Sequence, residues 1–329
     1  MTIRFAINGF GRIGRAVARA YFEGSFEGLE LVAINATATP EKNLHLFQYD
    51  SVHGRFNGRC EVADNNYLIN EDKVVALSER NPELLPWGDL GVDVVLECTG
   101  IFNNKAGCQK HIDSGAKKVV ISAPGKDDDI KTVIYKVNHD ILESDDNIIS
   151  IGSCTTNCLA PVVKLLHDEY QITRGYVTTV HAYTNDQNIA DANHKDLRRA
   201  RAAALSMIPT STGAAKAIGK VITDLKGKLD GCAIRVPTPN VSMIDFTFNT
   251  VKPMSEESIN SLLKNSASNM LGYNDKPLVS IDYNHTTESS IFDATGTKVI
   301  DDTFARVTAW YDNEWSFAIR MLDILKLMP

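Results

Sequence analysis

The sequence predicts an α/β fold with two domains, in which a parallel, doubly wound sheet precedes an α+β domain with a mostly antiparallel sheet. A short apolar strand at residues 3–7 runs directly into a glycine-rich turn. Further apolar runs alternate with helical segments through the first half, as in parallel sheets covered by helices. In the second half, apolar and polar residues alternate along the strands, which is typical of antiparallel sheets.

The composition is that of an ordinary globular protein with room for two domains. The chain has 329 residues, of which 43% are hydrophobic and 23% charged. A formal net charge of −7 disfavours nucleic acids and anionic membranes as partners. No stretch approaches the roughly 18 apolar residues of a membrane-spanning helix, and the N-terminus turns glycine-rich too soon for a secretory signal. We therefore expect a soluble, cytoplasmic protein.

The six cysteines, at positions 60, 98, 108, 154, 158 and 232, form no paired framework, so reduced thiols are expected. Cys154 and Cys158 are close in sequence, but no second close pair or histidine cluster accompanies them. We therefore predict no metal site.

The first strand, Ile3–Ile7, leads into Gly9-Phe10-Gly11-Arg12-Ile13-Gly14 and a helix at residues 15–22. In this strand, G-x-G-x-x-G, helix order, the glycines permit a tight turn and close approach of the backbone to a pyrophosphate at the helix N-terminus. An ordinary glycine turn is the alternative. The flanking strand and helix favour a Rossmann-type dinucleotide-binding domain, with Gly9 and Gly11 at the cofactor.

Four further strands are predicted in the first half, at residues 29–35, 92–98, 118–122 and 148–151. The segment from residue 45 to residue 80 is less regular, and Asn65-Asn66 is typical of a turn between two extended segments. We expect an antiparallel or meandering insertion there.

The end of the second predicted strand bears on the choice of cofactor. NAD-specific sites commonly carry an acidic side chain there, which binds the ribose hydroxyls, whereas this chain has Asn35-Ala36-Thr37. Without a carboxylate, a 2′-phosphate meets less repulsion, although no arginine directly follows to bind one. NAD is expected and NADP stays open alongside it, with Thr37 and Lys42 as candidate phosphate contacts.

Ser153-Cys154-Thr155 stands where an apolar run gives way to a predicted helix at residues 155–170. At a helix N-terminus, unpaired N–H groups and the helix dipole favour a negative sulfur over a neutral one. Cys154 is therefore a candidate nucleophile. Cys158 lies about one helical turn further on, and we assign it no role beyond that of a neighbour of Cys154.

A nucleophilic cysteine needs a proton acceptor, which an imidazole can be near neutral pH. His181 lies near the end of a predicted strand at residues 176–181 and is the best placed of the eight histidines. A single histidine is more often an ordinary surface or core residue, and spacing alone does not prove contact with Cys154.

Hydroxyl and arginine side chains in the second half are suited to phosphate. Arg198–Arg201 lies in a polar loop, Pro209–Gly213 opens a predicted helix at residues 214–222, and Arg235 ends a strand. N–H, hydroxyl and guanidinium donors are the groups that bind phosphate. Alternatively, the threonines only cap the helix and the arginines are only solvated charges. Because the chain also has a predicted cofactor site, we favour a phosphate-binding role for these residues.

The rest of the chain predicts further antiparallel strands and a closing helix. The strands are expected at residues 233–236, 242–251 and 304–311, and a helix is expected to begin after Met254 with Ser255 as its cap. The closing helix spans residues 316–327. We assign residues 1–152 and 316–329 to the NAD(P)-binding Rossmann domain, and residues 153–315 to the catalytic domain.

Three motifs together closely resemble phosphorylating glyceraldehyde-3-phosphate dehydrogenase, and the likeness runs from end to end. They are Asn8–Gly14, Ser153–Cys158 and Trp310–Glu314. The resemblance implies a homotetramer, with residues 183–203 at a subunit interface, that converts glyceraldehyde 3-phosphate, NAD(P) and inorganic phosphate to 1,3-bisphosphoglycerate through a Cys154 thioester. In this family the catalytic pair matches Cys154 as nucleophile and His181 as base. The implied substrate and phosphate residues are Ser153, Thr155, Thr184, Arg199, Thr212, Gly213 and Arg235. The implied cofactor residues, besides the glycines, are Arg12, Ile13, Arg80, Ser122 and Asn313.

The chain departs from the family pattern at two places. Ala36 stands at the family's ribose-binding aspartate, which puts strict NAD specificity in doubt, and Trp315-Ser316-Phe317 replaces its usual glycine-tyrosine. The related erythrose-4-phosphate dehydrogenase shares the cysteine and histidine but departs from Tyr183–Asp186 and Ser211–Gly213, which are intact here. A nucleotide-binding interaction protein without activity is the more distant alternative.

Overall fold

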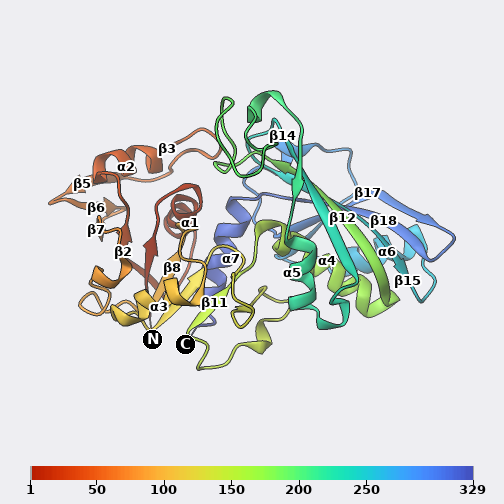
Figure 1. The fold of residues 1–329 in the computed structure, drawn as a ribbon, viewed down its shortest axis with the longest axis horizontal. Helices are drawn as coiled ribbons and strands as arrows, with labels where there is room; N and C mark the ends of the chain where they lie inside the picture. Colours follow the sequence, from red (N-terminus) through yellow and green to blue (C-terminus); the bar gives the residue numbers. More distant parts are fainter. Residues whose placement is uncertain (1, 329) are drawn as a thin grey trace. The chain divides into compact units, whose positions relative to one another are not determined.

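The computed structural model describes residues 2–328, which form two compact units (Figure 1). The first unit contains the residues up to Tyr135, residues 139–152 and the residues from Ala318 onward. The second contains residues 136–138 and 153–317. The described helices include none that is long and apolar enough to cross a lipid bilayer.

The first unit is built on a nine-stranded sheet with the order β10-β11-β9-β8-β1-β2-β7-β6-β5. The strands from β10 to β7 are parallel to their neighbours, whereas β7, β6 and β5 are antiparallel. These strands are β1 (Ile3–Asn8), β2 (Leu29–Asn35), β5 (Cys60–Ala63), β6 (Asn66–Ile69), β7 (Asp72–Leu77), β8 (Val94–Glu97), β9 (Lys118–Ile121), β10 (Lys131–Thr132) and β11 (Ile148–Ser150). The predicted α/β class and the predicted antiparallel insertion are both confirmed.

Three helices of the first unit lie in the connections between its strands. They are α1 (Arg12–Glu23), α2 (Pro40–Gln48) and α3 (Lys105–Asp113). Most of α7 (Trp315–Leu325), which follows the last strand, also belongs to this unit. A short hairpin, β3 (Tyr49–Asp50) with β4 (Gly54–Arg55), follows α2. Helix α1 begins earlier than predicted, at Arg12, so the glycine motif overlaps its first turn. Strands β8 and β9 are buried along their whole length, as expected of strands covered on both faces.

The second unit contains a seven-stranded sheet with the order β13-β14-β12-β15-β18-β17-β16. It is mostly antiparallel, as predicted, but the β12/β14 and β16/β17 pairs are parallel. Its strands are β12 (Ile172–Ala182), β13 (Ile208–Ser211), β14 (Leu229–Val236), β15 (Ser242–Thr250), β16 (Leu271–Asn274), β17 (Ser290–Ile300) and β18 (Phe304–Tyr311). Helices α4 (Cys154–Tyr170) and α6 (Glu256–Asn265) pack on one face of this sheet, and α5 (Ala214–Val221) packs against α4 and β14 (Figure 1).

Two features of the second unit differ from the sequence-based predictions. Residues 209–211, from the segment expected to open a helix, belong instead to the edge strand β13, where Pro209 is tolerated because an edge strand has unpaired positions. Strands β16 and β17 were not predicted, and the pairing of β17 with β18 is irregular between Asp293 and Lys298.

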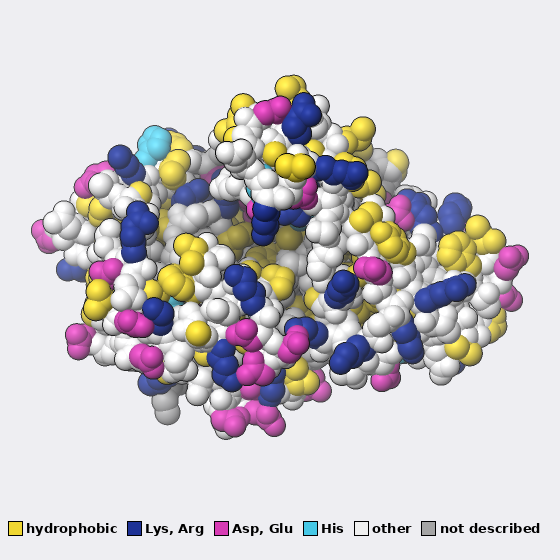
Figure 2. Space-filling view, viewed as in Figure 1, with side chains coloured by type: hydrophobic (Ala, Val, Ile, Leu, Met, Phe, Trp, Pro, Cys, Tyr) yellow, Lys and Arg dark blue, Asp and Glu magenta, His cyan; other side chains and the backbone are white. Residues whose placement is uncertain are grey.

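The loop between β12 and β13 exposes four large hydrophobic side chains. They are Ile189, Leu197, Leu205 and Met207, which are between 75% and 92% exposed. Figure 2 shows hydrophobic side chains beside Lys and Arg side chains in the upper part of the view, where Figure 1 draws this loop. An exposed apolar group of this kind is typical of an interaction surface.

Candidate active site

Cys154 is the first residue of α4, at the helix N-terminus as the sequence predicts. Ser153 caps the helix, because its Oγ accepts a hydrogen bond of 3.1 Å from the backbone N–H of Thr156. Asn157 Nδ2 donates to the Ser153 carbonyl over 2.9 Å. The cap fixes the start of the helix and therefore the position of Cys154, which is a half-buried residue.

His181 lies near the end of β12, with Nε2 3.5 Å from the Sγ of Cys154. The structure thus brings together the two residues predicted as nucleophile and base. In the parallel register of β12 with β14, His181 is the direct partner of Arg235. Nη1 of Arg235 lies 2.6 Å from Nδ1 of His181 and 2.9 Å from the Ala182 carbonyl oxygen.

Nδ1 of His181 has two close neighbours that favour opposite tautomers. A guanidinium can only donate, so a bond from Arg235 requires Nδ1 to accept and places the hydrogen of the neutral imidazole on Nε2. The Ala182 carbonyl can only accept and lies 2.7 Å from the same Nδ1, so it favours the hydrogen on Nδ1. Arg235 therefore competes with this carbonyl over whether Nε2, the ring nitrogen that faces Cys154, has a free lone pair.

Burial dominates the electrostatics of this pair. Burial raises the pKa of the Cys154 thiol above its ordinary value, although the Arg235 charge and the Thr155 N–H lower it. Burial and then Arg235 lower the pKa of His181 to about 3. At neutral pH the thiol is therefore protonated beside a neutral imidazole. The helix N-terminus by itself does not make the thiolate, which corrects the expectation from sequence.

Tyr311, at the end of β18, supports the pair and was not predicted as a site residue. Its hydroxyl lies 2.8 Å from Thr155 Oγ1 and 2.9 Å from Thr179 Oγ1, and its ring meets His181 edge-on at 5.9 Å. Burial raises its pKa well above the ordinary value, so it remains a neutral phenol. Only the alternation of the strand that ends at residue 311 could have indicated a buried tyrosine here.

Arg235 also has the unsatisfied donor expected of an anion site. Its Nε is buried and has no hydrogen-bond partner among residues 2–328, and burial lowers the pKa of its guanidinium. A buried donor without an acceptor is costly, and a phosphate oxygen would satisfy it. Arg199 is close enough to lower the pKa of His181, and it binds Asp186 and, over 2.9 Å, Thr210 Oγ1.

The other predicted phosphate residues are distributed along the second unit. Gly213 precedes α5, and a side chain there would meet nothing within 4 Å, which leaves the N-terminus of this helix open. Thr212 Oγ1 accepts from the Ala214 N–H over 3.2 Å. The Thr184 N–H donates to Gln187 Oε1 over 3.3 Å. The contact of these residues with phosphate stays a prediction.

A cavity of about 620 Å³ in the first unit matches the predicted dinucleotide site. Each motif glycine has its own reason to be glycine: Gly9 has φ of +97°, a Cβ at Gly14 would lie 2.1 Å from the Gly9 carbonyl, and a Cβ at Gly11 would enter open space. This agrees with a turn, close helix-strand packing and room for a pyrophosphate. The residues that line the cavity include Gly9, Gly11, Arg15, Asn35, Ala36, Thr37, Glu79 and Arg80.

Arg12, Ile13 and Ser122, also predicted at the cofactor, do not line this cavity. Arg12 binds Asp50 in a salt bridge of 2.6 Å, and Arg15 lines the cavity instead. Asn313 belongs to the second unit, where its Oδ1 accepts from Ser242 Oγ over 2.8 Å. Its assignment to the nicotinamide stays a prediction.

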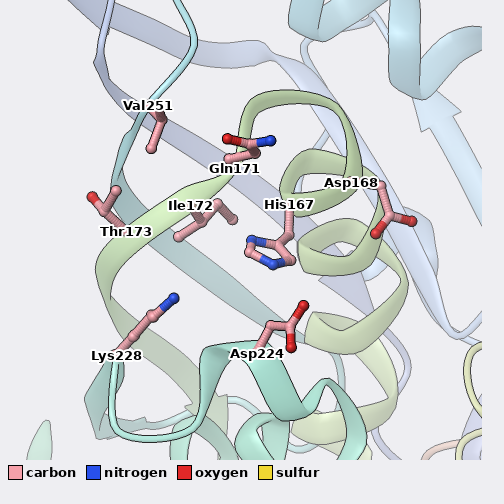
Figure 3. Close-up of a pocket in the computed structure, with 8 residues that line it drawn as sticks. All are labelled: His167, Asp168, Gln171, Ile172, Thr173, Asp224, Lys228 and Val251. Atoms are coloured by element: carbon pink, nitrogen blue, oxygen red, sulfur yellow. The ribbon is translucent and has the colours of Figure 1, made fainter.

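A second cavity, of about 510 Å³, lies at the C-terminal end of α4. Figure 3 shows the His167 ring beside Asp224, with Lys228 on another wall. The other lining residues are Asp168, Gln171, Ile172, Thr173 and Val251. It contains no cysteine, and burial lowers the pKa of His167. This cavity is distinct from the Cys154 site.

Comparison with known proteins gives one consistent family. The family model "Glyceraldehyde 3-phosphate dehydrogenase, C-terminal domain" matches residues 153–313, and "Glyceraldehyde 3-phosphate dehydrogenase, NAD binding domain" matches residues 3–105. The chain is 54% identical over 328 residues to the plasmid glyceraldehyde-3-phosphate dehydrogenase of Cupriavidus necator, covering 98% of this chain and 97% of that protein. It is 53% identical over 326 residues to the glyceraldehyde-3-phosphate dehydrogenase of Pseudomonas aeruginosa, with the same coverage.

Proposed function

The chain belongs to the glyceraldehyde-3-phosphate dehydrogenase family, and from this premise we propose how its residues oxidise and phosphorylate D-glyceraldehyde 3-phosphate. The enzyme is an NAD-dependent oxidoreductase of glycolysis and gluconeogenesis, and its product is 1,3-bisphosphoglycerate. The observation that carries the mechanism is the 3.5 Å approach of Cys154 Sγ to His181 Nε2. We assign dinucleotide binding to residues 1–152 and 316–329, and catalysis to residues 153–315.

The cycle begins when the Cys154 thiol gives its proton to His181 and the sulfur attacks the aldehyde carbon, whose oxygen takes that proton back from His181 and becomes the hydroxyl of a thiohemiacetal. His181, neutral again, then accepts the hydroxyl proton as the hydride on the same carbon leaves. NAD supplies the hydride acceptor. A thioester then remains on Cys154. The Cys154 backbone N–H and protonated His181 stabilise the negative oxygen as it forms.

Substrate phosphate activates this pair by drawing Arg235 away from His181. The buried Nε of Arg235 has no acceptor among the described residues, and the same guanidinium lies 2.6 Å from Nδ1, where it favours the accepting form of that nitrogen. When a phosphate binds Arg199 and Arg235, the hydrogen of the neutral imidazole is on Nδ1 and no longer on Nε2. Nδ1–H then donates to the Ala182 carbonyl, 2.7 Å away. Nε2 is then free to accept the thiol proton. The thiol thus becomes nucleophilic only when a phosphorylated substrate is present.

Inorganic phosphate completes the reaction by attacking the thioester. One phosphate oxygen bonds to the acyl carbon, the carbon–sulfur bond breaks, and the sulfur regains a proton from His181. We assign the binding of this phosphate to Ser153, Thr155, Thr184, Thr212 and Gly213, by donors that include the open N-terminus of α5.

The lining of the cavity of the first unit fits NAD: the backbone N–H groups of the glycine turn would bind the pyrophosphate, and Arg80 in the same lining would supply a further donor. NADP is accepted alongside NAD, because Ala36 removes the carboxylate that would repel a 2′-phosphate and Arg80 lines the same cavity. Glu79, which lines it too, already accepts from the Asn81 N–H through Oε1.

An erythrose-4-phosphate dehydrogenase would release its thioester to water, and the phosphate dependence of NADH formation separates the two activities. We expect turnover of glyceraldehyde 3-phosphate to fall to a small residual rate without phosphate. Turnover that is independent of phosphate would favour the alternative. A protein that binds NAD but forms no NADH under either condition would be the non-catalytic relative.

The enzyme works as a homotetramer in the cytoplasm, with the loop of residues 183–203 at a subunit interface. Two observations support this proposal: the loop and the residues that follow it expose four large hydrophobic side chains, and the free cysteines suit a reducing compartment. Sedimentation of the wild-type protein and of Leu197→Glu tests it. The substitution should shift the tetramer toward smaller species.

A further inference from the structure

A buried hydrogen-bond network lies behind the dinucleotide cavity, and we propose that Glu97, at the end of β8, is a positioning residue for NAD. Glu97 is 1% exposed and is not among the residues that line the cavity. It acts through Asn8 and Asn35, which do line it. The proposal rests on the proposed function only in taking NAD as the ligand.

Four donors surround the Glu97 carboxylate. The Thr99 N–H donates to Oε1 over 2.7 Å, and the Thr99 hydroxyl donates to the same oxygen. On the other side, Asn8 Nδ2 donates to Oε2 over 2.6 Å, and His111 Nε2 lies 3.2 Å from it. An acceptor-only group satisfies all four donors, so Glu97 is a carboxylate.

His111 and Trp87 complete the inner side of the network. The Trp87 indole can only donate, and its Nε1 lies 3.0 Å from His111 Nδ1. Nδ1 therefore accepts, and Nε2 of the neutral imidazole carries the hydrogen that is donated to Glu97. His111 and Trp87 are both fully buried, so this tautomer is fixed by the core.

The outer side of the network reaches the cavity. Because Asn8 Nδ2 faces Glu97, its Oδ1 accepts from Asn35 Nδ2, 2.7 Å away. Asn35 then holds the backbone of Glu79 by two bonds: Oδ1 accepts from the Glu79 N–H over 2.9 Å, and Nδ2 donates to the Glu79 carbonyl over 2.8 Å. The next residue is Arg80. The carboxylate thus fixes the orientation of two asparagine amides and the backbone that carries Arg80.

Glu97→Gln tests this chain of contacts, because the glutamine amide places an NH₂ group among donors. In the place of Oε2, this NH₂ group would face the Asn8 Nδ2 donor. If the Asn8 amide rotated so that its oxygen accepted from the glutamine, its NH₂ group would face the Asn35 Nδ2 donor instead. No rotation of one amide repairs the network. We expect the Kd of NAD, measured by titration calorimetry on the NAD-free full-length protein, to rise about tenfold. The kcat at saturating NAD should change less than about twofold, since no reacting group is touched.

Hydrogen exchange gives a second readout, since the Glu79 N–H should exchange faster in Glu97→Gln without NAD. The matched control is Val119→Ala, which creates a cavity in the same sheet. The Val119 side chain is fully buried and lies outside the hydrogen-bond network. It should lower stability but leave the Kd of NAD unchanged.

If Glu97→Gln does not fold, His111→Leu carries the same test, because it removes the Nε2–H donor without supplying another and leaves the carboxylate. It should weaken NAD binding about threefold. Unchanged NAD affinity in the folded variant would overturn the proposal and reduce the network to a structural role. Wild-type protein that fails to bind NAD would instead overturn the proposed function.

Discussion

Arg235 Nη1 lies 2.6 Å from Nδ1 of His181, where this donor competes with the Ala182 carbonyl, 2.7 Å from the same nitrogen, over the tautomer of the catalytic base. The two residues are register partners on β14 and β12. The contact links substrate phosphate to the chemistry at Cys154, because the group that would bind the phosphate is the group that restrains the base.

Arg235→Leu tests this link. Loss of the guanidinium should raise KM for glyceraldehyde 3-phosphate about 10- to 100-fold, since a charge-assisted bond to phosphate disappears. Arg235 lowers the pKa of His181, so its removal raises that pKa. The acidic limb of the kcat/KM profile should then move to higher pH, because His181 acts in its unprotonated form. Arg174→Leu, a change to an exposed arginine of β12 that binds Asn249, serves as the control and should alter neither quantity.

His181→Gln removes the proton acceptor without changing the position of the nucleophile. We expect kcat to fall by about 10²- to 10⁴-fold, the range for a lost general base. Stopped-flow measurement of the NADH burst will check it, since formation of the thioester precedes phosphate attack. His167→Gln, in the second cavity of Figure 3, is a matched change at the far end of α4. A burst as fast in His181→Gln as in this control would exclude His181 as the base.

Ala36→Asp should restore discrimination against NADP. A carboxylate at this position would bind the ribose hydroxyls of NAD and repel a 2′-phosphate. We predict that kcat/KM for NADP falls at least about tenfold while that for NAD is kept or improved. Steady-state rates with each dinucleotide, compared with the exposed control Ala63→Asp, measure the effect. If the ratio of the two cofactors does not change, residue 36 does not set the specificity.

Asp50→Asn should remove a pH dependence of stability. Burial raises the pKa of Asp50, but hydrogen bonds and charge outweigh it and lower this pKa from 3.8 to about 2. The groups that lower it are the His53 N–H, Arg12 and the Val52 N–H. A lowered carboxyl pKa stabilises the fold above the unfolded value and loses that contribution as pH falls toward the folded value. Urea unfolding between pH 4 and about pH 2 should therefore show a flatter loss of stability in Asp50→Asn than in wild type. The exposed control, Asp145→Asn, should retain the wild-type slope.

Much of the fold could be predicted because local chemistry sets it. A strand, a glycine turn and a helix require Gly9 and Gly14 in a fixed order, and Ser153 before Cys154 is a helix cap. Strands β16 and β17 could not be predicted in this way. Strand β17 contains Gly296, and its pairing with β18 is irregular, so its extended state depends on its neighbours in the sheet.

The geometry of the site was only partly accessible from sequence. Cys154 and His181 were identified by type and position, but their contact depends on how α4 packs on β12. The register that pairs His181 with Arg235 is a tertiary property. The same holds for the pKa of Cys154, because sequence indicates the helix N-terminus but not the burial that outweighs it.

The most direct test of the mechanism is mass spectrometry of the enzyme quenched after one turnover with NAD and glyceraldehyde 3-phosphate but no inorganic phosphate. We predict one acyl group on Cys154, which is present in the control Cys158→Ser, absent in Cys154→Ser, and lost when phosphate is added. Phosphate-dependent NADH formation that survives in Cys154→Ser would contradict it.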